Sequence, residues 1–374
     1  MIRTAIVGLG KMGLSHLAIL NMHPDLNMVG ICDSAGYVRD VLGKYTGLAC
    51  YDDFDQMLER TEAEAVLVAV PSKLHAPMVE KALRRGADVF CEKPFVLDAS
   101  DGERLVALAE EKRLVTQVGY HNRFIGAFQE AARLVASGAL GRVHHVRVEA
   151  YGPVVLREKG STWRGVKTEG GGALYDYACH GIDLMNFVVG TPQSVDGVVR
   201  HSIFSRDVDD EVYCTMRYAN GTSGQLCVNW SDESFRKMST KIMVWGTNGR
   251  ITADRQECQI YLRQTHPSMP ELAPGWTIRY TTDLTDEVWY YLRGEEYSAQ
   301  IDYFAESVKR RRLDGVNNFR SALEVDRVVE MITGEALVAR SGSASQPTGN
   351  GVEPISIRRE IATRIKNFVA SRRA

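Results

Sequence analysis

A carboxylate and an imidazole lie four residues apart in the segment Gly170–Asp183, directly after a run of three glycines. In a helix, residues spaced i and i+4 lie on one face, so Asp176 and His180 could point into the same pocket. Such a pair can move a proton to or from a substrate oxygen. The alternative is structural: a buried histidine with satisfied hydrogen bonds, and an aspartate that favours a helix start.

The N-terminal residues predict a dinucleotide site. A strand-like run over 2–7 leads into Gly8-Leu9-Gly10-Lys11-Met12-Gly13, and a helical pattern follows, with His16 on its buried side. This is the GxGxxG fingerprint in its required context, between a strand and a helix. The first glycine makes a tight turn, the second lets the backbone approach the pyrophosphate, and the third lets the helix pack on the strand. We expect the cofactor to contact Gly8, Gly10, Lys11, Met12 and Gly13.

Asp33 ends a second strand-like run, at about 28–32. The fingerprint expects an acidic residue about twenty positions past its last glycine. A carboxylate there accepts hydrogen bonds from the ribose diol and repels a 2′-phosphate, so the sequence favours NAD. The alternative role for Asp33 is to cap the next helix. Arg39 lies within reach of the adenosine ribose, which leaves NADP open.

Strands and helices alternate as far as about residue 120. Runs at 65–70, 88–91 and 115–120 resemble buried strands, with helical patterns between them. This alternation predicts βαβ units and a parallel sheet, whose ligands gather at the carboxyl ends of its strands. Pro71 and His75 follow one such end, and we expect them at the cofactor. Lys93 follows another and is restricted by Pro94, although an exposed turn lysine is the alternative.

Five motifs occur in a fixed order: the fingerprint, the 71–75 turn, Glu92-Lys93-Pro94, the segment 119–124 and Gly170–Asp183. In this order the chain resembles, over about residues 1–340, the glucose–fructose oxidoreductase / inositol dehydrogenase / rhizopine-catabolism (Gfo/Idh/MocA) family of sugar and polyol dehydrogenases.

The resemblance implies that Lys93 lies near the reacting hydroxyl and the nicotinamide. It also implies that Asp176 orients substrate hydroxyls and that His180 is the general acid/base. The unperturbed pKa of histidine is near ~6.5, so His180 could accept a proton close to neutral pH. Glu92 joins the expected cofactor contacts, and His121 and Arg123 join the substrate contacts. The family often has asparagine where this chain has His121.

Two further features concern the same region. Trp163 and Arg164, with Arg157 and Lys167, could clamp a carboxylate or phosphate of a sugar, because arginine binds planar anions with paired hydrogen bonds. Solvated loop charges are the alternative explanation. Asp183 could serve only to fix the His180 helix against the cofactor domain.

The second half of the chain predicts a mostly antiparallel sheet. Apolar runs recur from about 143 to 262, and Asn-Gly pairs at 220–221 and 248–249 indicate hairpins. We therefore expect a Rossmann domain at 1–123, an α+β domain with a large open sheet at 124–340, and a linker with an amphipathic tail at 341–374. As the resemblance implies, the sheet would pair with another subunit in a homodimer or homotetramer.

Composition narrows the function classes. The 374 residues suffice for two cores, and a net charge of −2 provides no basic field for nucleic acid. No apolar stretch approaches the ~20 residues of a membrane span. Seven cysteines without C-x2-C spacing argue against a zinc site and for reduced thiols in the cytoplasm.

Together these observations predict an NAD(H)-dependent oxidoreductase that acts on a secondary hydroxyl or keto carbon of a sugar, cyclitol or sugar derivative. Two alternatives remain open. One is a glycoside-cleaving enzyme that uses transient oxidation, and the other is a non-catalytic dinucleotide-binding sensor. The sequence names neither the substrate nor the physiological direction.

Overall fold

The computed structural model describes residues 1–154 and 163–342. Contacts group Met1–Leu337 into one compact unit and Val338–Ala374 into another. The two sheets lie in the first unit. Arg157 and the expected tail beyond residue 342 lie outside the described residues, and the division at residues 123 and 340 stays a prediction.

The first sheet has six parallel strands in the order β3-β2-β1-β4-β5-β6. The strands are β1 (Ile2–Val7), β2 (Leu26–Cys32), β3 (Cys50–Tyr51), β4 (Ala65–Val68), β5 (Asp88–Cys91) and β6 (Thr116–Val118). The helices between them are α1 (Lys11–Met22), α2 (Gly36–Thr46), α3 (Phe54–Thr61), α4 (His75–Arg84) and α5 (Ala99–Glu111). The strand order reverses between β1 and β4, which is where a doubly wound sheet binds its ligands. The predicted Rossmann sheet is confirmed.

The second sheet has eight strands in the order β14-β13-β12-β11-β7-β10-β9-β8. They are β7 (Val143–Tyr151), β8 (Ser194–His201), β9 (Glu211–Arg217), β10 (Ser223–Asn229), β11 (Ser239–Gly246), β12 (Gly249–Asp254), β13 (Glu257–Leu262) and β14 (Gly275–Tyr280). Only β7 and β10 pair in parallel among the described strands of this sheet, so the prediction of a mostly antiparallel sheet is confirmed. Both Asn-Gly pairs lie in hairpin connections, between β9 and β10 and between β11 and β12.

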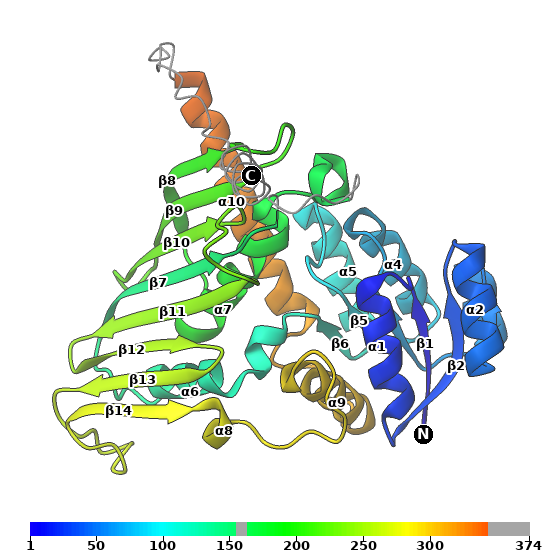
Figure 1. Cartoon of the computed structure of the whole chain (residues 1–374), viewed down its shortest axis with the longest axis horizontal. Helices are drawn as coiled ribbons and strands as arrows, with labels where there is room; N and C mark the ends of the chain where they lie inside the picture. Colours follow the sequence, from blue (N-terminus) through cyan, green and yellow to red (C-terminus); the bar gives the residue numbers. More distant parts are fainter. Residues whose placement is uncertain (155–162, 343–374) are drawn as a thin grey trace, which may run out of the picture. The chain divides into compact units, whose positions relative to one another are not determined.

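One face of the second sheet is covered by α6 (Gly126–Ala136) and α7 (Cys179–Val189) (Figure 1). The strands alternate accordingly: in β11 every second residue is buried, and the residues between them are partly exposed. This is the period of a half-buried strand. The opposite face carries no described helix or strand.

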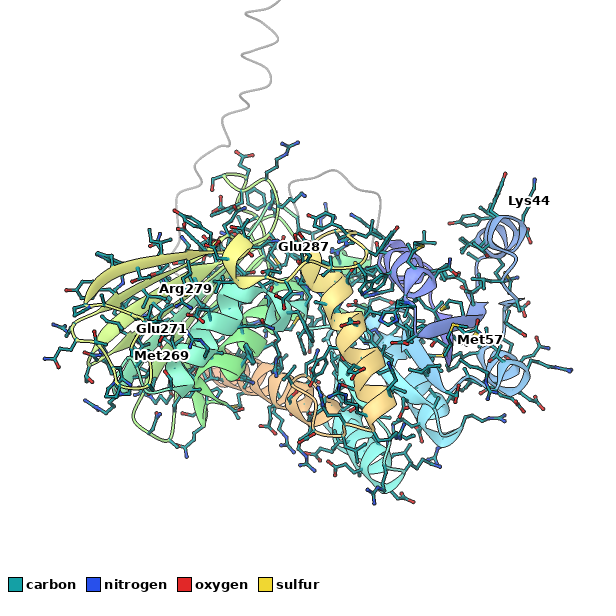
Figure 2. The ribbon with its side chains drawn as sticks, turned by 90° about the horizontal axis from the view of Figure 1, so that it is seen from below. Lys44, Met57, Met269, Glu271, Arg279 and Glu287 are labelled. Atoms are coloured by element: carbon teal, nitrogen blue, oxygen red, sulfur yellow. The ribbon has the colours of Figure 1, made fainter. Side chains whose placement is uncertain are left out.

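Ion pairs tie α6 to the edge strand β14. Glu130 Oε1 lies 2.9 Å from Arg279 Nη1, and Glu130 Oε2 lies 2.7 Å from Arg133 Nε. Glu271 lies 3.5 Å from Arg133 and 3.7 Å from Arg279 (Figure 2). A network of several charges can fix an edge better than an isolated surface pair.

After β14, the short helix α8 (Thr281–Leu284) precedes α9 (Glu295–Arg310) and α10 (Phe319–Gly342). They return the chain to the first sheet: Val118 N–H of β6 donates to Asn317 O at 2.9 Å, and the ring centroids of Phe95 and Phe319 lie 4.3 Å apart. One hydrophobic cluster therefore runs through both halves. No helix in residues 1–154 and 163–342 is long and apolar enough to cross a membrane.

Candidate active site

The glycine fingerprint has the geometry of an anion-binding turn. Gly8 has φ +89°, and a Cβ there would lie 2.6 Å from the carbonyl carbon and oxygen of Ala69. A Cβ at Gly13 would lie 1.8 Å from Gly8 O, so the helix and the turn pack too closely for a side chain. A Cβ at Gly10 would meet no atom within 4 Å, and α1 starts after it without a side-chain cap. This open side and uncapped helix start fit a dinucleotide pyrophosphate.

Asp33 lies directly after β2, and its carboxylate stabilises the glycine-rich turn. Its Oδ2 accepts the Leu9 N–H at 2.6 Å, and its Oδ1 accepts the Ala35 N–H at 2.8 Å. Since α2 starts without a side-chain cap, Asp33 does not cap that helix. Arg39 Nη1 donates to Asp33 O at 2.7 Å, so the guanidinium does lie beside Asp33. Ribose contacts by either residue stay predictions.

His75 contacts the loop that follows β4 and the loop that follows β5, both of which are expected at the cofactor. It is buried, with Nδ1 2.7 Å from Pro94 O and Nε2 3.0 Å from Val70 O. Burial lowers its pKa more than these two carbonyls raise it. Pro71 is exposed and precedes the turn η1 (Ser72–Leu74). His75 therefore connects the loop after β4 to the Lys93–Pro94 bond, which is cis.

Glu92 connects the cofactor helix to the loop that follows β5. Its Oε1 lies 2.6 Å from His16 Nε2 of α1, and its Oε2 accepts the Lys93 N–H at 3.1 Å. Burial raises the pKa of Glu92, but the hydrogen bond and charge of His16 and the charge of Lys93 lower it more. The sequence reasoning placed His16 on the buried side of its helix and did not identify this partner.

Lys93 meets Asp176 across the two halves of the chain. Its Nζ donates to Asp176 Oδ1 at 2.8 Å and to Asp176 O at 2.9 Å. Burial alone would lower the pKa of Lys93, but the attraction of Asp176 outweighs it and the pKa is raised. Lys93 is therefore a charged ammonium held next to Asp176.

The segment that carries Asp176 and His180 does not start as a regular α-helix. Leu174–Ala178 forms a π-helical turn, and α7 starts only at Cys179. Asp176 and His180 thus lie on either side of a junction rather than on one regular α-helix. π-turns inside helices are frequent at functional sites. Here the turn contains Asp176, whose carbonyl accepts from Lys93.

His180 is 3% exposed, and its Nδ1 is buried without a hydrogen-bond partner among the described residues. Its ring centroid lies 4.9 Å from that of His121. Burial, and then the charges of Lys93 and His121, lower the pKa of His180 well below 6.5. The pKa of His180 is therefore displaced from the unperturbed value of histidine, and the imidazole is neutral at neutral pH.

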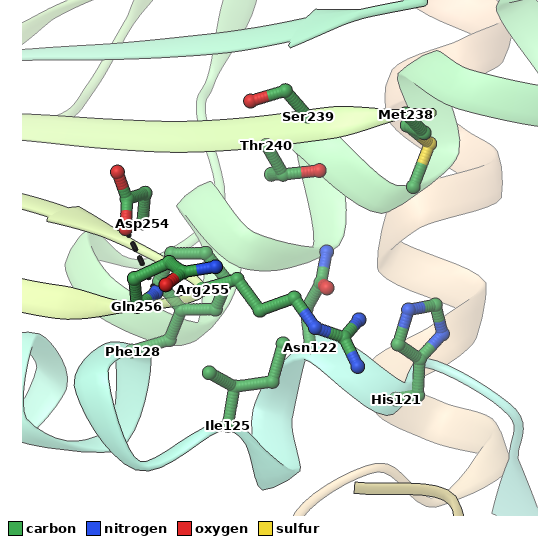
Figure 3. Close-up of a pocket in the computed structure, with 10 residues that line it drawn as sticks. All are labelled: His121, Asn122, Ile125, Phe128, Met238, Ser239, Thr240, Asp254, Arg255 and Gln256. Atoms are coloured by element: carbon green, nitrogen blue, oxygen red, sulfur yellow. Dashed lines mark hydrogen bonds between the residues drawn. The ribbon is translucent and has the colours of Figure 1, made fainter. Parts of the chain in front are cut away.

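His121 joins this cluster to a cavity of about 200 Å³. Its ring stacks on Tyr297 of α9, with centroids 4.9 Å apart. Burial lowers the pKa of His121 to about 3, and the charges of Arg255, Lys93 and Arg293 add to that. Figure 3 shows the Arg255 side chain extended toward His121. The cavity is lined by His121, Asn122, Ile125, Phe128, Met238, Ser239, Thr240, Asp254, Arg255 and Gln256.

Arg123 has other partners than a substrate. Its Nε and Nη2 lie 3.0 and 2.6 Å from Asp183 Oδ1, and its Nη1 donates to Val316 O. Both charged side chains are buried. The pair joins α7 to the turn η2 (His121–Phe124), as the structural alternative for Asp183 expected. The geometry gives Arg123 a positioning role, and its contact with a substrate stays a prediction.

Arg164 reaches the other oxygen of Asp176. Its Nε lies 2.8 Å from Asp176 Oδ2, and its Cζ lies 4.8 Å from the ring centroid of Trp163. Burial would raise the pKa of Asp176, but Lys93 and Arg164 lower it to about 2. Lys167 is exposed on the same loop. No cluster of three His, Cys, Asp or Glu that could hold a metal occurs in the described part of the chain.

Comparison with known proteins covers both halves of the chain. Residues 2–120 match the model of an oxidoreductase family with an NAD-binding Rossmann fold (GFO_IDH_MocA), and residues 128–252 match the GFO/IDH/MocA C-terminal domain. An uncharacterised oxidoreductase of Schizosaccharomyces pombe is 31% identical over 272 residues, or 70% of this chain and 73% of its own. A 2,7-anhydro-N-acetylneuraminate hydratase of Mediterraneibacter gnavus is 25% identical over 366 residues, or 93% of this chain and 94% of its own.

Among solved structures, a levoglucosan dehydrogenase in complex with NADH and levoglucosan has a TM-score of 0.79 to this chain. It is 20% identical, and the match covers 90% of this chain and 97% of that one. At this identity the likeness concerns the fold.

Proposed function

Because this chain belongs to the Gfo/Idh/MocA family of oxidoreductases, we propose that it transfers a hydride between NAD(H) and a secondary hydroxyl or keto carbon of a sugar, cyclitol or sugar derivative. The observation that carries the proposal is the meeting of Lys93, Asp176 and His180. A buried ammonium, its carboxylate partner and a neutral imidazole are the groups that such a reaction needs.

The neutral imidazole of His180 accepts the proton of the reacting hydroxyl when the substrate is oxidised. The Lys93 ammonium stabilises the negative charge that develops on the substrate oxygen, because its pKa is raised and it does not give up its own proton easily. Asp176 holds Lys93 in place and orients substrate hydroxyls. In the reducing direction the protonated His180 returns the proton to the oxygen.

NAD is the cofactor that the turn between β1 and α1 supports, and when bound it supplies the hydride chemistry. Gly8, Gly10, Lys11, Met12 and Gly13 would hold its pyrophosphate, and Asp33 its ribose. The levoglucosan dehydrogenase of the same fold binds NADH and a sugar, which supports both the cofactor and the substrate class.

A second candidate function uses the same cofactor for a different reaction. This reaction is the cleavage of a glycosidic or anhydro bond through transient oxidation, with no net formation of NADH. The relative from Mediterraneibacter gnavus favours this candidate, since it is named a hydratase and aligns with 93% of the chain. A dinucleotide-binding sensor would not need a proton-transfer set, and the convergence of Lys93, Asp176 and His180 speaks against it.

The proposal is tested by supplying NAD with a panel of sugars, cyclitols and sugar derivatives and following NADH absorbance. His180→Ala and Lys93→Met should each lose about 10²–10⁴-fold in kcat while NAD still binds. Lys112→Met, an exposed lysine at the end of α5, is the matched control. Near-normal turnover in either site variant contradicts the assignment, whereas product release from a glycoside without net NADH supports the second candidate.

A further inference from the structure

Arg164 has donors that nothing in the described structure uses. Its Nε binds Asp176 Oδ2 at 2.8 Å, but its Nη1 and Nη2 have no hydrogen-bond partner among the described residues. The side chain is 37% exposed, so these two groups remain accessible from the site. Two parallel N–H groups on a planar guanidinium match the oxygens of a carboxylate or phosphate.

The loop that carries Arg164 is held in position by the glycine run. A Cβ at Gly171 would lie 2.4 Å from Arg164 O and 2.7 Å from Trp163 O, so glycine lets the two segments touch. Gly172 N–H donates to Arg164 O at 3.0 Å. The guanidinium also packs on the Trp163 ring, which restricts its plane. Arg164 is therefore a pre-positioned cation and not a freely moving surface charge.

The acidic groups around it are already engaged. Asp176 is shared between Lys93 and Arg164, so one carboxylate serves two cations. Glu92 binds His16 and the Lys93 N–H. Glu169, on the same loop, pairs with Lys73. A ligand that brings its own negative charge would supply the acceptor that Arg164 lacks.

We propose that Arg164 binds an anionic group of the substrate, so that the enzyme acts on sugar acids or sugar phosphates in preference to neutral sugars. This inference rests on the proposed function, because it places the substrate at Lys93. Lys93 and Arg164 bind the two oxygens of the Asp176 carboxylate, so an anion held by the Nη groups of Arg164 lies next to Lys93 and the reacting carbon. The competing ligand is the cofactor pyrophosphate, because Gly170 of this loop lies against Ser72 of the turn after β4.

The test compares D-glucuronate, D-galacturonate and D-glucose 6-phosphate with D-glucose and D-galactose. We expect the wild-type enzyme to favour at least one anionic member in kcat/KM. Arg164→Gln should raise the KM of that member by about 10- to 100-fold, as expected for a lost charged hydrogen-bond pair. The same variant should lower kcat/KM for the neutral sugars by a clearly smaller factor, because Arg164 also binds Asp176, and it should change the Kd of NAD by no more than about 3-fold. The KM of Arg164→Lys for the anionic sugar should lie between those of the wild type and of Arg164→Gln. Lys112→Gln is the surface control.

Calorimetric titration of the NADH-loaded protein with the same sugars provides a readout without turnover. If Arg164→Gln loses the same affinity for anionic and for neutral sugars, Arg164 only positions Asp176. If the variant binds NAD more weakly, Arg164 belongs to the cofactor site. Absence of any preference for an anion in the wild-type protein also overturns the inference. If anions bind through Arg164 but no sugar is oxidised, the proposed function fails and the inference stands.

Discussion

The protonation state of His180 decides which direction of the reaction the apo site is prepared for. The side chain is buried and lies within the electrostatic reach of Lys93, and both effects disfavour a charged imidazole. The neutral ring is a proton acceptor. His180 can therefore accept a hydroxyl proton, and the reducing direction requires an imidazolium that is a stronger acid here than a free one.

This state can be measured by NMR titration of labelled histidines. We expect the pKa of His180 to lie below 6.5, and the acidic limb of kcat/KM for oxidation to lie below that pH. Lys93→Met removes a neighbouring positive charge and should move the pKa of His180 upward, because the imidazolium is then less disfavoured. Lys112→Met should leave it unchanged. A His180 pKa that falls or stays constant in Lys93→Met contradicts this account.

The sequence indicated which residues are candidates for the site better than it indicated which residues they contact. Lys93, Asp176 and His180 could be identified because their motifs are short and local. The bonds from His16 to Glu92 and from Arg164 to Asp176 join residues 76 and 12 positions apart, so they depend on tertiary packing. For the contact between His16 and Glu92, the available signal was that His16 is a polar residue on the buried side of α1. The sequence did not indicate the second contact: Arg164 was expected to bind an anionic group of the substrate or to be a solvated loop charge.

The three glycines at 170–172 do more than precede the start of a helix. Gly170 and Gly172 have φ of +80° and +105°, which residues with a Cβ rarely adopt. Gly171 instead allows the carbonyls of Trp163 and Arg164 to approach. The spacing i, i+4 cannot distinguish an α-turn from the π-turn that follows, and this is why the sequence predicted one continuous helix.

Gly171→Ala tests the close approach. The added Cβ would meet backbone oxygen at 2.4 Å, so the loop must move. We expect a loss of about 1–3 kcal/mol in the free energy of unfolding, as for an overpacked site, and at least about a tenfold loss in kcat/KM. Gly165→Ala is the control in the same loop, because its Cβ would meet no atom within 4 Å. Chemical denaturation and steady-state kinetics report both quantities, and equal behaviour of the two variants would falsify the packing argument.

The whole molecule is held together by the helices that return from the second half. Asp326 and Glu330 of α10 accept the N–H groups of Val96 and Ala99, which follow the Lys93–Pro94 bond in the first half. The alternation of strands and helices predicted both sheets, because each pattern is local. The order of the eight strands and the parallel pairing of β7 with β10 join distant segments, and no local pattern indicates them.

The face of the second sheet that α6 and α7 leave uncovered bears a row of aromatic side chains. The ring centroids of Trp276 and Tyr261 lie 5.3 Å apart, and Arg250 packs on both Trp276 and Trp245. On the edge strand β14, alternate residues Trp276, Ile278 and Tyr280 are 58%, 47% and 51% exposed. Soluble monomers rarely present apolar side chains in such a continuous row, and an edge strand with this surface is a site for pairing.

We therefore expect the protein to assemble through this face into dimers or tetramers of its 41.6 kDa chain. Size-exclusion chromatography with light scattering measures the mass. Trp276→Glu combined with Ile278→Glu should shift it to the monomer, because each dimer would bury the new like charges without partners. Tyr37→Lys, which changes a side chain 75% exposed on α2, should leave the mass unchanged. A wild-type protein that runs only as a monomer at micromolar concentration, or a double variant with the wild-type mass, would show that subunits do not meet at this face.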